Sequence, residues 1–325
     1  MKMYAYVKNA QNSMRRKEEG IMEKAKKTLV RAWNYKWIYL MLLPVVIYFI
    51  VFRYAPMYGI TIAFKNYNIF KGISDSPWVG FDIFAKIFAN KNFWSAIKNT
   101  FVLNLASLAV SFPLTIIVSL MLNELGHAKF KKITQSILYL PHFISWVVVA
   151  GIATNMFALQ DGTINMVLQR LGIDSVPFLS DNGWWIFTYI ACNVWKEIGW
   201  GTIIYLAALT GVDESLYEAA YLDGASKFQR LIYITLPSIK SVIVTMLILS
   251  LSKMMSIGLD APLLLGNSKV MGVSEVISTY TYRIGIEKAL YSDSTAIGLF
   301  QSVVNIIILF AADRFAKLIG EEGIL

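Results

Sequence analysis

The sequence predicts an all-α integral membrane protein that crosses the bilayer six times. Of its 325 residues 56% are apolar and only 16% are charged, and the mean hydropathy is +0.54. A soluble globular protein carries about 25% charged residues, so the composition excludes that class. The apolar runs are long and poor in charge, which favours helices over the alternating strands of an outer-membrane barrel.

Six apolar runs each come close to the roughly 20 residues that cross the hydrocarbon core of a bilayer. An even number of spans places both termini on the same side. The segments assigned inside hold 18 Lys or Arg residues and those assigned outside hold ten. Because cytoplasmic segments are enriched in Lys and Arg, both termini are expected in the cytoplasm. The expected spans are 37–54, 100–122, 134–158, 183–210, 238–258 and 295–313.

The segment before the first span is strongly basic. Residues 1–36 hold ten Lys or Arg against three Glu and have little sustained apolar pattern. Such a segment sets topology and contacts anionic lipid. We therefore expect a cytoplasmic extension that lies partly along the membrane surface.

The segment 53–99 is assigned outside although it is also basic. Several Pro and Gly residues interrupt it, and an amphipathic stretch near 81–93 is expected to lie on the membrane before the second span. Its positive charge favours either an acidic ligand or docking partner, or lysines that snorkel along the lipid surface. Its basic residues are Arg53, Lys65, Lys71, Lys86, Lys91 and Lys98.

A polar island interrupts the apolar runs at 218–237, and its sequence predicts two short helices joined by a turn. Two Ser residues are each followed three positions later by Glu or Gln, which is the spacing of a capping box. Gly224 suits the C-terminal turn of the first helix, and Pro237 suits the first turn of the following long helix. Glu218 is explained equally well by capping and by contact with a partner. The two capping pairs are Ser215 with Glu218 and Ser226 with Gln229.

Signatures of enzymes and metal sites are missing from the sequence. It has no Gly-x-x-x-x-Gly-Lys-Ser/Thr loop to hold phosphates and no Gly-x-Ser-x-Gly elbow. The single cysteine, Cys192, excludes an intrachain disulfide and is expected to serve packing. The two histidines, His127 and His142, are far apart and show no metal-binding spacing. The chain is therefore not expected to be an enzyme or to bind a metal or cofactor itself.

The polar island resembles the cytoplasmic loop of permease subunits of binding-protein-dependent ABC importers. The loop pattern in that family is Glu-Ala-Ala, then Asp-Gly-Ala, then Ile-x-Leu-Pro, and this sequence has those residues at 218–220, 223–225 and 234–237. The resemblance covers about 95–315 and is to the MalF-like carbohydrate branch, LplB-type. Further stretches that support it lie at 139–146, 194–199, 205–209 and 298–305.

The resemblance implies a role for each part of the island. In that family the loop forms a helix that lies in a groove of an ATPase subunit and transmits its closure to the membrane helices. Small residues would let two helices approach closely, and the Leu-Pro pair would form a rigid joint to the next span. The residues expected to couple to the ATPase are Glu218, Ala219, Ala220, Asp223, Gly224, Ala225, Leu236 and Pro237.

The resemblance also implies the architecture and the partners. The fold would be the six-helix transmembrane domain of a type I ABC importer in a bacterial plasma membrane. Its partners would be a second permease subunit, two ATPase subunits that hold ATP and Mg, an external solute-binding protein and the lipid bilayer. The substrate would be an oligosaccharide, more narrowly an acidic one such as an alginate or glycosaminoglycan fragment, and no nucleic acid is expected. The expected parts are a basic extension (1–36), a first span with an external segment (37–94), a permease core (95–315) with a coupling loop (211–237), and a cytoplasmic tail (316–325).

Polar and aromatic residues inside the spans are candidates for a translocation path. A charge in hydrocarbon is costly, so Lys196 and Glu197 are expected to meet another helix or a water-filled cavity rather than simply each other. Sugar binding needs aromatic faces together with amide and hydroxyl groups. The same residue types also belong to membrane interfaces and helix contacts. The candidates are Trp195, Lys196, Glu197, Trp200, Gln301, Ser302 and Asn305.

Two other classes of function remain open from the sequence. An ion- or proton-coupled carrier would use Lys196 and Glu197 as a relay and would transport without an ATPase. No internal repeat of the kind found in many such carriers is apparent. A membrane receptor or assembly scaffold would show neither transport nor stimulation of an ATPase.

Overall fold

The computed structural model describes residues 33–318, 320 and 323, so the predictions for residues 1–32 lie outside the described part. The chain divides into two compact units, Met1–Thr61 and Ile62–Leu325. The described residues are almost entirely helical and contain no strand longer than an isolated bridge. The predicted all-α fold is confirmed.

The described part of the first unit, residues 33–61, consists mainly of one apolar helix. It begins as α2 (Lys36–Phe49), continues through a π-helical turn, η1 (Ile50–Tyr54), and passes into the 3₁₀ helix η2 (Ala55–Phe64). The helical stretch is 29 residues long and none of its most apolar window is buried. It ends ten residues beyond the predicted span, since the chain continues as a 3₁₀ helix through Pro56 instead of ending there.

Five helical segments of the second unit correspond to the other predicted spans. In the described residues, three helices of the chain are long and apolar enough to cross a membrane, and two bent pairs raise the number to five. The sixth, α9, has 28 residues, or about 42 Å at 1.5 Å per residue, but its Trp, Asn, Lys and Glu lower its hydropathy. The segments are α5 (Lys91–Asn123), α6 (Ala128–Tyr139) with η3 (Leu140–Phe143) and α7 (Trp146–Phe157), α9 (Asn182–Leu209), α11 (Lys227–Arg230) with η4 (Leu231–Thr235), α12 (Leu236–Ser238) and α13 (Lys240–Leu251), and α17 (Tyr291–Leu318).

Two of the predicted spans are bent, which the sequence analysis did not anticipate. The chain turns by 99° between η3 and α7, and by 62° between α12 and α13. At the first bend Ser145 leaves the helical conformation, and its hydroxyl caps α7. The fifth span also ends at Leu251, short of the predicted 258, where the chain enters a series of turns. These bends leave backbone groups inside the spans that need partners.

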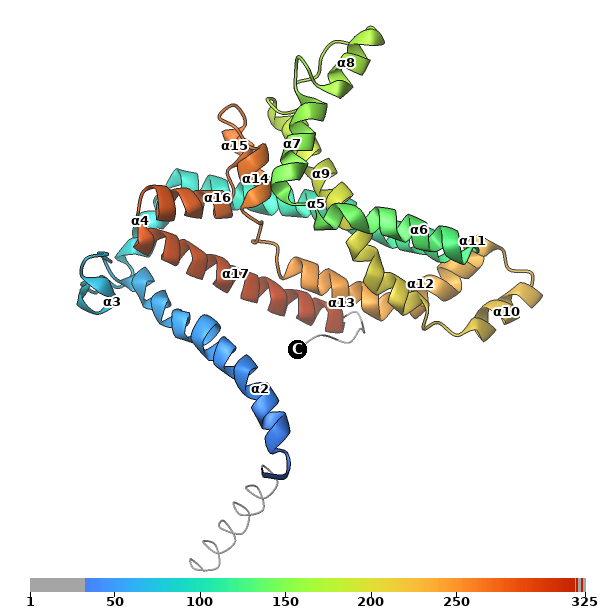
Figure 1. The fold of residues 1–325 in the computed structure, drawn as a ribbon, viewed down its shortest axis with the longest axis horizontal. Helices are drawn as coiled ribbons and strands as arrows, with labels where there is room; N and C mark the ends of the chain where they lie inside the picture. The colour runs from blue at the N-terminus through green and yellow to red at the C-terminus, as the bar shows by residue number, and fades with distance from the viewer. Residues whose placement is uncertain (1–32, 319, 321–322, 324–325) are drawn as a thin grey trace, which may run out of the picture. The chain divides into compact units, whose positions relative to one another are not determined.

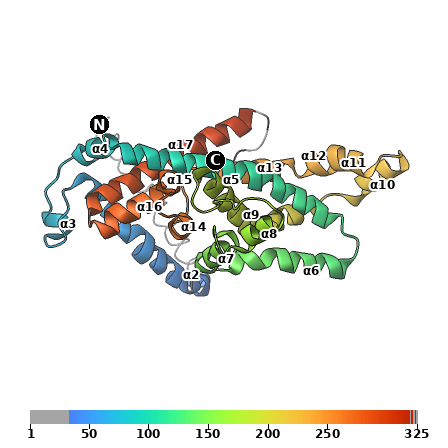
Figure 2. The same cartoon turned by 90° about the horizontal axis from the view of Figure 1, so that it is seen from above.

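Short helices connect the spans at both ends of the second unit. Figures 1 and 2 both place α10 (Glu214–Leu222) and α11 at one end of this unit, and α4 (Asp82–Phe88) at the other. The part of the predicted external segment that forms α4 and the polar island are therefore at opposite ends of the second unit, as the predicted topology requires. The remaining short helices are α3 (Gly72–Asp75), α8 (Thr163–Arg170), α14 (Asp260–Leu265), α15 (Met271–Ser274), α16 (Ile277–Tyr282) and the π-helical η5 (Arg283–Glu287).

Two basic residues of the predicted external segment make contacts that stabilise its fold, one within the segment and one to α17. Lys65 Nζ donates to the backbone carbonyl of Ile73 at 2.6 Å, and Lys86 Nζ pairs with Asp293 Oδ2 on α17 at 2.6 Å. The predicted amphipathic stretch forms α4, whose Ile83 is buried in the protein core. Part of the segment's positive charge therefore serves its own fold, which neither sequence interpretation had included.

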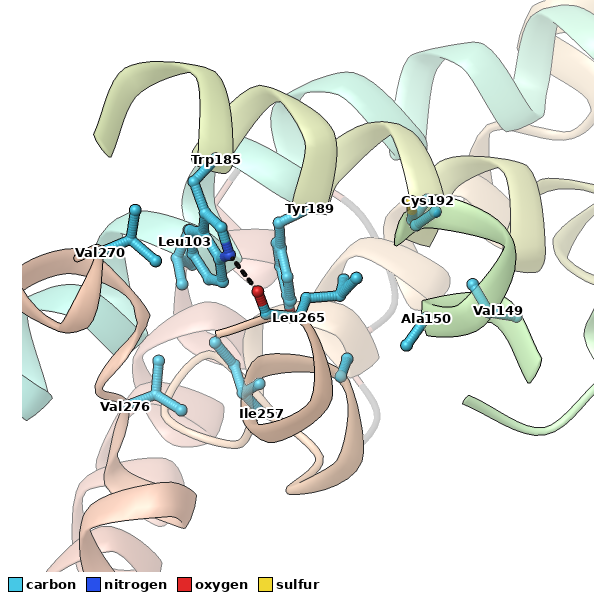
Figure 3. Packing of buried hydrophobic residues seen from close by; sticks show 12 residues of the cluster. Leu103, Val149, Ala150, Trp185, Tyr189, Cys192, Ile257, Leu265, Val270 and Val276 are labelled. Atoms are coloured by element: carbon cyan, nitrogen blue, oxygen red, sulfur yellow. Dashed lines mark hydrogen bonds between the residues drawn. The ribbon is translucent and has the colours of Figure 1, made fainter. Parts of the chain in front are cut away.

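A buried cluster fixes α9 against α7 and the loop that contains α14 (Figure 3). Trp185 is fully buried, and its indole N–H donates to the carbonyl of Leu265 at 2.9 Å. Its ring stacks on Tyr189 with 5.4 Å between the centroids. Cys192 lies in the same cluster, so its predicted packing role is confirmed. The cluster makes α9 a fixed support for the residues that follow it along the helix.

Candidate functional site

The polar island forms the two short helices that the sequence predicts, α10 and α11. Gly224 joins them with a φ of +77°, a conformation that costs a side-chain-bearing residue about 1–2 kcal/mol. Its N–H donates to the carbonyl of Tyr221 at 3.1 Å, and the N–H of Ala225 donates to that of Ala220 at 2.9 Å. These two bonds make a Schellman turn, so the helix C-terminal turn predicted at Gly224 is confirmed.

One of the two predicted capping boxes is present. The Ser226 hydroxyl accepts from the N–H of Gln229 at 3.3 Å, and the Gln229 side chain accepts from the N–H of Ser226 at 2.8 Å. The other, Ser215 with Glu218, is wrong. α10 begins at Glu214, and Asp213 caps it by accepting the N–H of Ser215 at 2.9 Å. That hydrogen bond holds the pKa of Asp213 below its usual value.

Without a capping role, Glu218 lines an open hollow between α10 and α11. The hollow has a volume of about 470 Å³. The guanidinium of Arg230 lies 5.8 Å from the centre of the Tyr221 ring, and Leu222 is 85% exposed. Exposed apolar residues beside Tyr and Arg are typical of a protein interface. The hollow is lined by Tyr217, Glu218, Tyr221, Leu222 and Arg230.

The other predicted coupling residues are not among those that line this hollow. Ala219 lies on the exposed side of α10, whereas Ala220 is half-buried. The small side chain of Ala219 is therefore accessible from outside the chain. Asp223 ends α10, and Leu236 and Pro237 begin α12. Four of the five residues that line the hollow were not predicted from the sequence. Two of these, Tyr217 and Tyr221, stand four residues apart on one helix face, a spacing that could have identified them.

Lys196, a candidate for the translocation path, binds the backbone at the bend between α6 and α7, which agrees with the expectation that it meets another helix. It is 6% exposed, and its ammonium donates to the carbonyls of Pro141 and His142 at 3.4 and 2.5 Å. A Cβ at Gly199, one turn further along α9, would overlap the carbonyl of Leu138. α9 therefore approaches the end of α6 closely and supplies the donor that the bend requires.

His142 and two of the path candidates form an accessible group beside the same bend. His142 Nδ1 lies 2.8 Å from Glu197 Oε2, and its ring stacks on Trp200 with 4.4 Å between centroids. Glu197 Oε1 is also 3.7 Å from Lys196 Nζ, but the closer contacts of both residues are to η3, as the expected meeting with another helix requires. The side chain of Glu197 is 42% exposed and Trp200 is 45% exposed. The carboxylate of Glu197, the imidazole of His142 and the indole ring of Trp200 thus lie together at a partly exposed surface.

Gln301 and Asn305 on α17 bind a second irregular segment, the turns after α13. The Gln301 amide donates to the carbonyl of Met255 at 2.7 Å. Asn305 accepts from the N–H of Met255 at 3.0 Å and donates to the hydroxyl of Ser256 at 2.8 Å. Asn104 on α5 donates to the carbonyl of Met254 at 2.7 Å. These amides therefore satisfy backbone groups of the broken helix before any ligand is considered.

Two path candidates join neither group. Trp195 lines a separate apolar cavity of about 340 Å³ between α7 and α9, together with Cys192. The Ser302 hydroxyl donates to the carbonyl of Gly298 on its own helix at 2.8 Å. The described residues contain no cluster of three or more His, Cys, Asp or Glu placed to hold a metal ion. The structure thus separates the seven candidates into backbone supports, one accessible group and two isolated residues.

Comparison with known proteins places this arrangement in a family. Residues 154–321 match the family described as "Binding-protein-dependent transport system inner membrane component". Protein LplB of Bacillus subtilis (strain 168) is 43% identical over 289 residues, covering 89% of this chain and 91% of LplB. The polygalacturonan/rhamnogalacturonan transport system permease protein YteP of the same organism is 43% identical over 302 residues, covering 93% and 94%.

A solved structure agrees in fold over nearly the whole chain. It is the crystal structure of a bacterial alginate ABC transporter in complex with an alginate pentasaccharide-bound periplasmic protein. The matching chain has a TM-score of 0.82 and 38% sequence identity, and the match covers 90% of this chain and 98% of that one. The matched family part contains the polar island. The chain therefore belongs to the inner membrane components of binding-protein-dependent transport systems, as a multi-pass, LplB-type carbohydrate ABC permease rather than an enzyme.

Proposed function

We propose that this permease imports an acidic oligosaccharide, which an external solute-binding protein delivers, and that partner ATPases drive it through α10 and α11. A second, similar permease subunit would complete the path. ATP and Mg would bind to the two ATPase subunits, and both termini of this chain would lie in the cytoplasm. The observation that carries the proposal is the exposed hollow around Glu218, at the end of the second unit opposite α4.

The coupling step follows from what that surface offers a partner. Tyr221 and Leu222 are 70% and 85% exposed, whereas Thr235 at the base of the next span is buried. An ATPase groove would cover the exposed apolar residues of α10, and Arg230 and Glu218 would supply charge at its rim. ATP would shift the transporter between inward- and outward-facing states only as far as it binds one state better than the other.

The choice of an acidic oligosaccharide rests on the relatives and on the bend beside α9. YteP is named for polygalacturonan and rhamnogalacturonan transport, and the solved neighbour for alginate, all of which contain uronic acids. Here Glu197 already has two partners, His142 at 2.8 Å and Lys196 at 3.7 Å, so a negative substrate would not face an unpaired carboxylate. The exposed part of the Trp200 ring would contact the apolar face of a sugar.

Reconstitution tests the proposal. The chain is placed in liposomes with its second permease, ATPases and binding protein, and uptake of labelled galacturonan, alginate and neutral malto-oligosaccharides is compared with and without ATP. ATP-dependent uptake of the acidic sugars supports the proposal. Uptake that persists without ATP would indicate an ion- or proton-coupled carrier instead. ATP-dependent uptake of neutral sugars alone would refute the acidic substrate but would still support the proposal that the protein is part of an ATP-driven importer.

A further inference from the structure

One hydrogen bond connects α10 directly to the base of the fifth span. The hydroxyls of Tyr217 on α10 and Thr235 lie 2.9 Å apart, although the residues are 18 positions apart in sequence. Thr235 is 5% exposed and is the last residue of the π-helical turn η4. Its hydroxyl also lies 3.4 Å from the carbonyl of Arg230, at the start of that turn. The Thr235 hydroxyl therefore belongs both to the turn and to the contact with α10.

The backbone offers a less direct route between the same two elements. It passes through the Schellman turn at Gly224, through α11 and then through η4. A movement of α10 along this route can be taken up by rotation at Gly224, because a glycine reaches many backbone conformations. The Tyr217–Thr235 bond bypasses that turn. It ends next to Leu236 and Pro237, where the span begins.

We propose that Tyr217 is a positioning residue for coupling, and that its hydrogen bond to Thr235 transmits the movement of α10 to the span. This inference rests on the proposed function, since it assumes that an ATPase moves α10. The bond holds α10 in a fixed orientation relative to η4 while the ATPase acts on the exposed face of α10. Without it, α10 follows the ATPase while the span lags behind, and ATP is hydrolysed without transport.

Paired measurements in one reconstituted complex test the inference. Uptake of galacturonan and alginate oligosaccharides and ATP hydrolysis are measured in the same vesicles for Tyr217→Phe, Thr235→Val and the double variant. Each single variant should keep its ATPase activity while ATP consumed per sugar rises about two- to tenfold, the range by which one neutral hydrogen bond shifts an equilibrium. The double variant should be no worse than either single one, because both changes break the same bond.

Two controls separate coupling from folding. Thr235→Ser retains the hydroxyl and should restore the wild-type ratio. Thr210→Val removes the hydroxyl bond to the carbonyl of Ala207 at the end of α9 and should leave the ratio unchanged. An unchanged ratio in Tyr217→Phe, additive single effects, or a parallel loss of assembly, ATPase and uptake would each overturn the inference. Absence of ATP-dependent uptake by the wild-type complex would instead refute the proposed function.

Discussion

Asp213 caps α10 by accepting the backbone N–H of Ser215 at 2.9 Å, so the Ser at the predicted cap position is already inside the helix. The short Asp side chain reaches that N–H while its own backbone stays extended, which is the usual geometry of an N-cap. A carboxylate at this position also interacts favourably with the positive end of the helix. The start of α10, the helix proposed to contact the ATPase, thus depends on a residue outside the Glu-Ala-Ala pattern.

The first prediction concerns that cap. Asp213→Ala should speed hydrogen exchange of the first-turn amides of α10, whereas Asp213→Asn, which keeps an acceptor, and Ser215→Ala should change it little. Because the folded pKa of Asp213 is lowered, the stabilisation is complete above the ordinary value of 3.8 and is lost as pH falls through the lowered pKa. Slow exchange in Asp213→Ala together with fast exchange in Ser215→Ala would favour the capping box instead.

The second prediction concerns the hollow between α10 and α11. Glu218→Lys reverses a charge there, and Gly224→Pro demands a φ near −65° where the chain has +77° and also removes an N–H donor. Both variants should insert normally but hydrolyse ATP without uptake. Glu124→Lys, an exposed reversal at the end of α5, serves as the control. Normal uptake by both hollow variants would refute the coupling role of this surface.

The third prediction concerns the close approach of α9 and α6. Gly199→Ala places a methyl group on the carbonyl of Leu138, so the two helices must separate. The expected loss is about 1–3 kcal/mol of stability, seen as a lower melting temperature of the purified protein in detergent. Gly298→Ala on α17, where a Cβ meets nothing within 4 Å, is the matched control. Equal melting temperatures for the two variants would contradict the predicted close packing.

The fourth prediction concerns Lys196. Lys196→Met keeps the length of the side chain but removes the ammonium donor from the carbonyl of His142. The carbonyl of Pro141 also loses this donor and keeps only the N–H of Ile144 at 3.1 Å. Removing a donor from buried polar groups costs about 1–3 kcal/mol, so the melting temperature should fall. Trp195→Ala, at the neighbouring position facing the apolar cavity, should not affect the bend. If Lys196→Met instead alters only substrate affinity, Lys196 belongs to the translocation path after all.

The fifth prediction concerns Glu275 in the turn before α16. Burial raises its pKa above the ordinary value of 4.5, although Arg283 lies 2.9 Å away and opposes the shift. The folded protein therefore favours the protonated form of Glu275 more than the unfolded chain does. The resulting contribution to the stability of the fold is complete below pH 4.5 and is lost as pH rises through the raised pKa. Glu275→Gln should remove this pH dependence from the melting curve between pH 4 and 8. An unchanged slope would assign the dependence to another group.

The sequence predicted well those elements whose signals are local. α9 runs from Asn182 to Leu209 against a prediction of 183–210, since Asp181 caps it and one long apolar run fills it. The turn at Gly224 was predicted equally well from its local sequence. In contrast, the bend after η3 depends on Lys196, which arrives from a helix more than 50 positions away in sequence. No local pattern carries that information.

The candidate path residues show why residue type alone does not reveal the partner of a polar side chain. An amide such as Asn305 can bind either a sugar hydroxyl or a backbone N–H, and the residue type is the same for both. The structure shows Asn305 bound to the N–H of Met255, because the turns after α13 leave that group without a helical partner. The sequence suggested unbroken spans, so it could not have shown that these turns would need side-chain partners.

The π-helical turn at Leu231–Thr235 affects the direction in which α10 and α11, the proposed ATPase-binding surface, face. A π turn holds more residues than an α turn of 3.6, and each residue of an α-helix rotates the chain by about 100°. Removing one residue here would convert the turn to α and swing α10 and α11 about the span axis by that amount, with every contact residue intact. The orientation of α10 and α11 relative to the fifth span thus depends on the number of residues in this turn. A comparison of side chains alone does not reveal it.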